Sequence, residues 1–376
     1  MFLLSVQTFL YRYIFKPIAF RFDPETVHDS ITIVGNWMGK HKLARQIARA
    51  FWHFENTALE QTIAGIHFPN PVGLTAGFDK DGLLTDILPD VGFGFVEIGS
   101  VTGKPCEGNP KPRLWRLPKS EALIVYYGLK NEGCDSIHDR LVHKKFRIPM
   151  GVSVAKTNCQ ETANVQNGIS DYVKAMKTFL DIADYITINI SCPNAFGGEP
   201  FTKPELLEQL LCATDALNPQ QPVFLKMPVD LSFEEIDKLV DVALLHKVHG
   251  FILSNLTKRR DRPEINSADL VPTEKGGISG RPVFDLSNNL IEHLYKRVGN
   301  RLILIGTGGI FSAEDAYEKI LRGASLVQLA TGMIFRGPQL IGQINHGLVR
   351  LLKRDGYKSI REAIVKGRKV GKVIRA

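Results

Sequence analysis

The sequence predicts an α/β fold, a (β/α)8 barrel with an N-terminal helical extension. Three features carry this prediction: eight short β-rich runs, longer amphipathic stretches between them, and glycine-rich turns after several of the runs. Eight strands that alternate with helices indicate a closed parallel barrel rather than an open sheet. The chain of 376 residues is long enough for one such barrel with about a hundred residues of extension.

The predicted strands are apolar runs bounded by turn residues. They are residues 72–78, 95–101, 150–156, 185–191, 223–228, 250–256, 301–306 and 326–330. Helical spacing of apolar residues predicts the helices 171–182, 204–217, 233–246, 284–298 and 313–321. The longest interruption, 102–149, is rich in glycine and proline, and we expect a long irregular loop at the functional face of the barrel.

Residues 1–53 are predicted to be a separate helical segment, and residues 54–376 the barrel domain. Residues 1–15 are apolar and are closed by Pro17, which makes them too short for a membrane span of about 20 residues. No small-residue cleavage site follows them, so we expect no secretory signal. Asp23 is the expected N-cap of a second amphipathic helix, with a proline at its first position.

The charge of the segment 1–53 suggests that it binds a membrane surface. It has seven Lys or Arg against three acids, and it holds Trp37 and Trp52 as possible interfacial anchors. We favour an amphipathic helix pair lying on anionic lipid over the alternative, a helical cap packed on the barrel. Because much of the net charge of +8 lies here, we expect no nucleic-acid partner.

The five cysteines are odd in number and form no CxxC pair. The sequence therefore predicts neither a disulfide framework nor a metal site, and it indicates a reducing compartment.

One predicted strand, 185–191, leads into a polar cluster, Asn-Ile-Ser-Cys-Pro-Asn at 189–194. Chemistry is therefore expected at the carboxyl end of this strand. A thiol at Cys192, flanked by the carboxamides of Asn189 and Asn194, can take a proton from a planar, amide-bearing ring. The alternative is a buried structural cysteine.

Two lysines point to an anionic ligand. Lys80 follows the first strand in a turn of small residues, where a flat cofactor can approach the backbone; the alternative is a surface lysine on a tight turn. Lys226 lies in an apolar strand and therefore requires a negative partner, such as the N1 edge of a reduced flavin. A structural carboxylate is the alternative, but the neighbouring strands supply no acid.

Glycine-rich turns at 276–282 and 306–309, and a third at 330–332, follow the last strands. In TIM barrels, backbone amides of these loops form the usual phosphate site, so a phosphate-bearing cofactor is favoured. A dinucleotide-binding fingerprint is missing after the first strand.

Taken together, the motifs at 76–80, 189–194, 276–282 and 306–310 resemble those of the dihydroorotate dehydrogenase family. The N-terminal helices resemble those of its membrane-associated, quinone-reducing class, in which they form a tunnel for the quinone. The resemblance implies FMN as cofactor, dihydroorotate and orotate as substrate and product, and quinone as acceptor. It also implies a peripheral membrane protein, at the cytoplasmic face of the inner membrane if the source is bacterial.

The resemblance further implies site residues. Substrate would be held by Lys80, Asn189, Asn194 and Asn255. FMN would be held by Ala76, Gly77, Lys80, Ser100, Ser153, Asn189, Lys226, Ser254, Gly280, Gly309, Ala330 and Thr331. In the family mechanism a base takes the C5 proton of dihydroorotate while a hydride passes to the flavin.

Several positions depart from the family pattern. Cys192 stands where the quinone-linked class has a serine base, and a thiol with an ordinary pKa of about 8.5 is the better base near neutral pH. Val125 replaces an asparagine that binds orotate, Leu129 a phenylalanine, Leu256 a threonine and Ser153 an asparagine near the flavin. Two alternatives stay open: an enzyme for another dihydropyrimidine-like cyclic amide, and a catalytically silent flavin binder.

Overall fold

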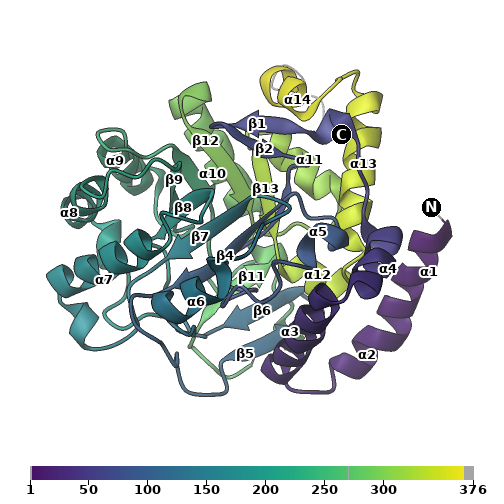
Figure 1. Ribbon diagram of the computed structural model, residues 1–376, viewed down its shortest axis with the longest axis horizontal. Helices are drawn as coiled ribbons and strands as arrows, with labels where there is room; N and C mark the ends of the chain where they lie inside the picture. Colours follow the sequence, from purple (N-terminus) through teal and green to yellow (C-terminus); the bar gives the residue numbers. More distant parts are fainter. Residues whose placement is uncertain (1, 270, 368–376) are drawn as a thin grey trace.

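The computed structural model describes residues 2–269 and 271–367, and eight parallel strands close into a barrel at its centre (Figure 1). The strand order around the barrel is β10-β12-β13-β3-β4-β7-β8-β9. Their bounds are β3 (Val72–Leu74), β4 (Phe95–Val101), β7 (Met150–Val154), β8 (Tyr185–Asn189), β9 (Val223–Met227), β10 (Gly250–Leu253), β12 (Ile303–Thr307) and β13 (Leu326–Leu329). Each predicted run overlaps one of these strands, and β12 ends one residue beyond its run, so the predicted (β/α)8 barrel is confirmed.

Helices surround the barrel (Figure 1). They are α5 (Leu88–Val91), α6 (Cys134–Leu141), α7 (Val165–Thr178), α8 (Pro204–Asp215), α9 (Phe233–Ala243), α10 (Phe284–Val298), α11 (Ala313–Leu321), α12 (Thr331–Arg336), α13 (Leu340–Arg354) and α14 (Ile360–Lys366). Helix α7 begins earlier than predicted because the side chain of Asn164 accepts hydrogen bonds from the amides of Gln166 and Asn167.

The amino end of the barrel is closed by an apolar plug. The hairpin of β1 (Gln61–Ile63) and β2 (Ile66–Phe68), which the sequence did not predict, supplies Phe68. Its ring meets that of Phe95 edge-on with centroids 5.4 Å apart. The plug consists of Phe68, Phe95, Tyr185, Phe224, Ile252, Ile305 and Leu326, each 3% exposed or less.

The N-terminal helices lie together at one side of the barrel (Figure 1). Helix α1 (Phe2–Leu10) passes through a π-turn, Tyr11–Phe15, into α2 (Lys16–Ala19). The prediction that Pro17 ends the first helix is therefore wrong. The wider π-turn accommodates a residue that donates no backbone hydrogen bond.

Two further helices complete this region. Helix α3 (Pro24–Lys40) begins as predicted, with the Asp23 carboxylate accepting from the amide of Thr26 at 2.8 Å. Helix α4 (Lys42–Trp52) was not predicted. Glu25, only 2% exposed, anchors α3 to the barrel domain through Arg113, whose Nη2 lies 2.7 Å from Glu25 Oε1.

The connection 102–149 is more ordered than predicted. It contains β5 (Leu114–Leu117), β6 (Ala122–Val125) and helix α6. Strand β6 pairs antiparallel with β11 (Gly277–Gly280) from far along the chain, and Val125 lies opposite Gly277. The expectation of an irregular loop is wrong because these strands find their hydrogen-bond partners only in the folded molecule.

Candidate active site

A single cavity of 1320 Å³ extends from the carboxyl ends of the barrel strands to the N-terminal helices. Nearly all the predicted site residues line it: Ala76, Gly77, Lys80, Ser100, Asn189, Cys192, Asn194, Lys226, Ser254, Asn255, Gly280, Gly309, Ala330 and Thr331. Ser153 is the exception, because its side chain is completely buried behind the cavity wall. The barrel thus brings together residues that are spread over most of the chain.

Asn189, the last residue of β8, is held by a chain of hydrogen bonds. Its Nδ2 donates to Ser100 Oγ at 2.8 Å, and Ser100 Oγ lies 2.7 Å from Ser153 Oγ. Its Oδ1 accepts from the hydroxyl of Ser191 at 3.1 Å. Ser153 therefore orients Ser100 rather than facing the cavity.

Cys192 lies just past β8 and is partly exposed. Burial of its sulfur raises the pKa of the thiol to about 11, although the amines of Lys156 and Lys226 favour the thiolate. The thiol is therefore protonated at neutral pH. The sequence-based argument used an ordinary thiol pKa of about 8.5, which does not include this burial.

The loop that carries Cys192 is fixed by hydrogen bonds the sequence did not predict. Asn194 Nδ2 donates to the carbonyl of Val125 at 2.8 Å, and Asn109 Nδ2 donates to the carbonyl of Asn194 at 3.0 Å. Lys156 Nζ donates to the carbonyl of Phe196 at 2.6 Å. Lys156 lies two residues past the end of β7 and is only 3% exposed, and a buried lysine after an apolar run is close to the signal that singled out Lys226 in the sequence.

Lys80 supplies one cation at the cavity wall. Its Nζ lies 4.1 Å from the centre of the Tyr127 ring, and burial lowers its pKa to about 8. Among residues 2–269 and 271–367 it forms no ion pair. Nearby, Gly77 has φ of +102°, and a Cβ added there would have no atom within 4 Å. The backbone at this turn is thus open to a ligand.

Lys226 supplies a second cation, 4% exposed at the next-to-last position of β9. Its Nζ lies 3.4 Å from Thr75 Oγ1. Burial lowers the pKa of Lys226, and the charge of Glu97 opposes that change. The neighbouring strands β8 and β10 carry no acid, as predicted from the sequence, but the buried Glu97 of β4 is close enough for its charge to act on Lys226. For the alternative in which Lys226 pairs with a structural carboxylate, Glu97 is therefore the candidate. The sequence did not identify it, because β4 and β9 are not adjacent strands.

Glycine turns border the other side of the cavity. Gly308 and Gly309, after β12, have φ of +97° and +73°, a conformation that favours glycine. A Cβ on Gly309 would lie 2.5 Å from Phe284. Ser279 Oγ lies 2.9 Å from Thr331 Oγ1, which joins β11 to the start of α12. These are the loops that bind phosphate in TIM barrels.

The outer wall of the cavity is apolar and comes from the N-terminal helices. It includes Leu10, Ile14, Phe15, Ile18, Val27, Ile31, Val34 and Met38. The same cavity therefore has a polar floor at the barrel mouth and an apolar entrance between helices.

The fold and this site define a (β/α)8-barrel enzyme with its active site at the carboxyl ends of the strands. The family model for dihydroorotate dehydrogenase matches residues 58–352. The chain belongs to the dihydroorotate dehydrogenase family, whose members are oxidoreductases. The predicted family membership is confirmed, and the family implies a flavin cofactor.

Curated relatives support this assignment. The chain is 36% identical over 369 residues to "dihydroorotate dehydrogenase (quinone)" of Nostoc punctiforme, covering 94% of this chain and 97% of that protein. It is 40% identical over 309 residues to the protein of the same name in Myxococcus xanthus, covering 80% and 82%.

A solved structure agrees with them. The Eimeria tenella enzyme, DHODH in complex with ferulenol, superposes with a TM-score of 0.82 at 29% identity, over 94% of this chain and 96% of that one.

Proposed function

We propose that this protein oxidises dihydroorotate to orotate with FMN and passes the electrons to a quinone, a step of de novo pyrimidine (UMP) biosynthesis. The observation that carries the proposal is the continuity of the cavity. A polar floor suited to a charged pyrimidine and an apolar entrance suited to a quinone belong to the same cavity.

The residues present fit a flavin mononucleotide. Lys80 and Lys226 face the cavity without an ion pair in the described part of the chain, and Gly77 leaves the backbone uncovered. The turns at Gly280 and Gly309 suit one phosphate, which favours FMN over a dinucleotide. When bound, FMN supplies the hydride acceptor for the substrate and the electron donor for the quinone.

We assign substrate binding to Lys80, Asn189, Asn194 and Asn255. A lysine ammonium suits the orotate carboxylate, and carboxamides can both donate to and accept from the amide edges of a pyrimidine. Asn255 Nδ2 donates to the carbonyl of Ser191 at 2.6 Å, so its orientation is fixed by the Cys192 loop. Three carboxamides and one amine thus surround the position beside Cys192.

Cys192 is the proposed base, which takes the proton from C5 of dihydroorotate at its Sγ. Its raised pKa keeps the sulfur protonated at neutral pH, so the reactive thiolate is a minor form stabilised by Lys156 and Lys226. The reaction is therefore expected to accelerate with pH.

Val125 and Leu256 favour a second candidate substrate. Both line the cavity, and neither offers a polar side chain. A dihydropyrimidine-like cyclic amide with fewer polar groups would suit them better. Mixing the protein with dihydroorotate and with dihydrouracil in parallel distinguishes the candidates by which one bleaches the flavin. In a catalytically silent flavin binder, neither dihydroorotate nor dihydrouracil would bleach the flavin, whereas dithionite would.

The electron acceptor is tested by reoxidation. Flavin reduced by dihydroorotate is offered a soluble quinone, fumarate or NAD, and we expect only the quinone to restore the absorbance rapidly. Fast reoxidation by fumarate or NAD would contradict the quinone assignment.

We propose residues 1–53 as a peripheral membrane-associating segment. Fifteen of the twenty exposed large hydrophobic side chains in the described chain lie between Val6 and Phe51. Trp37 is among them, whereas Trp52 is partly buried against the barrel, contrary to its expected role as an anchor. No helix among the described residues is long and apolar enough to span a bilayer.

Liposome binding tests this assignment. Deleting residues 1–20 should weaken the binding of the protein to anionic vesicles, and unchanged binding would contradict it. If the source is bacterial, the expected site is the cytoplasmic face of the inner membrane.

A further inference from the structure

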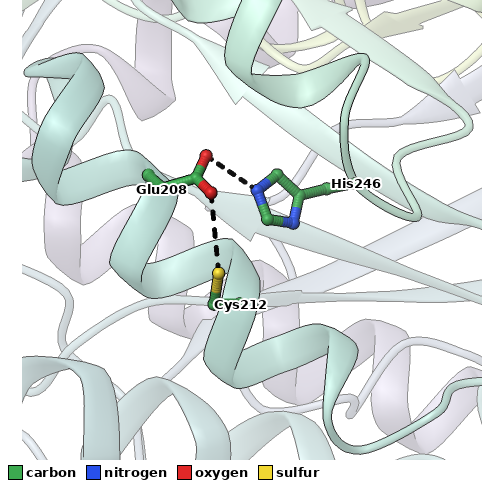
Figure 2. A group of neighbouring side chains, drawn as sticks. All are labelled: Glu208, Cys212 and His246. Atoms are coloured by element: carbon green, nitrogen blue, oxygen red, sulfur yellow. Dashed lines mark hydrogen bonds and ion pairs between the residues drawn. The ribbon is translucent and has the colours of Figure 1, made fainter.

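A second polar cluster lies outside the cavity, on the outer helices (Figure 2). Glu208 and Cys212 are one turn apart on α8, and His246 comes from the segment between α9 and β10. Their nitrogen, oxygen and sulfur atoms all lie within 4.8 Å of one another. Glu208 Oε2 lies 2.9 Å from His246 Nε2, and Cys212 Sγ lies 3.7 Å from Glu208 Oε1.

The imidazole of His246 is fixed from its other side. Its Nδ1 lies 2.8 Å from Asp215 Oδ2, and its side chain is only 7% exposed. A carboxylate on one ring nitrogen is the usual support for a histidine that binds metal through the other. The ring therefore presents Nε2 toward Glu208 and Cys212 in a fixed direction.

We propose that Cys212 Sγ, His246 Nε2 and a Glu208 oxygen bind one Zn²⁺, with water in the fourth position. Thiolate, imidazole and carboxylate together suit zinc, whereas magnesium and calcium prefer oxygen ligands alone. Zn²⁺ takes the place of the proton on Nε2 and of the thiol proton, so both protons leave to solvent. The Glu208 carboxylate, now between the other two groups, moves aside to admit the ion.

The position of the cluster suggests a structural role. Helix α8 leads into β9, and His246 lies four residues before the start of β10, so the cluster lies at the amino end of the barrel. Catalysis in TIM barrels occurs at the opposite end. A zinc ion here cross-links two successive β/α units and stabilises the fold without entering the reaction. Sequence spacing predicted no metal site, because these ligands meet only after α8 and α9 pack.

Alkylation of the full-length flavoprotein tests the site without a mutation. Iodoacetamide labelling is followed by peptide mass spectrometry with Zn²⁺ or with EDTA. We expect Zn²⁺ to slow labelling of Cys212 at least about tenfold. Cys159, a partly exposed thiol outside the cluster, is the internal control and should be labelled at the same rate with Zn²⁺ and with EDTA. Equal labelling of Cys212 in both conditions overturns the proposal.

Equilibrium dialysis with Zn²⁺ provides the second measurement. One high-affinity ion per chain is expected, weakened at least tenfold by Cys212→Ser and by His246→Gln, and about 10- to 100-fold by Asp215→Asn. His293→Gln is the matched control, because His293 pairs with Asp237 at 2.8 Å without a thiol beside it. Undiminished zinc affinity in Cys212→Ser would place the ion elsewhere and overturn the proposal.

Discussion

The two ends of the barrel are built from the same strands but differ in polarity and in packing. At the amino end, Phe95 and Tyr185 open their strands and belong to an apolar plug that the β1–β2 hairpin covers. At the carboxyl end, Asn189 and Ser254 face a 1320 Å³ cavity. The amino end is filled by side chains, whereas the carboxyl end leaves room for ligands.

The difference shows how one strand can serve both stability and chemistry. In β8, Tyr185 at the first position is completely buried in the plug, and Asn189 at the last position donates to Ser100 in the site. Substitutions at the two ends should therefore separate: those at the amino end lower stability, and those at the carboxyl end lower activity.

The largest expected effect is at Cys192. Loss of the proposed base in Cys192→Ala should slow flavin reduction by dihydroorotate about 10²- to 10⁴-fold and leave the unfolding midpoint nearly unchanged. Stopped-flow absorbance measures the rate. Cys159→Ala is the matched control, since it removes a thiol that does not line the cavity. A Cys192→Ala rate within a factor of two of the parent would remove Cys192 from the mechanism.

Phe95→Ala tests the opposite end. Its ring is completely buried in the plug, so truncation should lower the free energy of unfolding by about 3–5 kcal/mol. Urea unfolding gives this value. The rate of flavin reduction per bound flavin should match that of the parent protein. A large loss of this rate in folded protein would contradict the prediction that the amino end serves stability alone.

Val125→Asn should strengthen orotate binding by roughly 1–3 kcal/mol, because a carboxamide can satisfy a pyrimidine group that valine leaves unpaired. Titration of orotate followed by flavin absorbance measures the affinity. Val125→Leu is the control, since it adds volume without a polar group. No gain in affinity would indicate that the substrate lacks this group or lies elsewhere in the cavity.

The pH dependence of flavin reduction reports the protonation state of the proposed base in the unaltered protein. Burial raises the pKa of Cys192 to about 11, so the thiol form dominates below that pH and the thiolate grows as pH rises. The rate should increase about tenfold per pH unit between about pH 6 and pH 9. A plateau beginning near pH 8 would show that the pKa of the base is not raised.

Sequence predicted the barrel because fully buried parallel strands are continuous apolar runs. It placed the end of β8 two residues too late, since Ile190 and Ser191 are still buried but no longer pair. It missed β6, because the partner of Val125 is Gly277, far along the chain.

Within the site, residue types were predictable but their surroundings were not. Asn189 and Lys226 stood out as polar groups in apolar strands, and both line the cavity. The effect of Glu97 on Lys226 could not be predicted, because β4 and β9 are not adjacent and come close only in the closed barrel. The raised pKa of Cys192 likewise depends on a burial that no local pattern records.

We propose that the carboxyl end of the barrel holds a flavin beside a site for dihydroorotate. Anaerobic mixing of the purified, FMN-loaded protein with dihydroorotate tests it most directly. We predict that the flavin absorbance bleaches with formation of one orotate per flavin. If dithionite bleaches the flavin and excess dihydroorotate does not, the claim is contradicted.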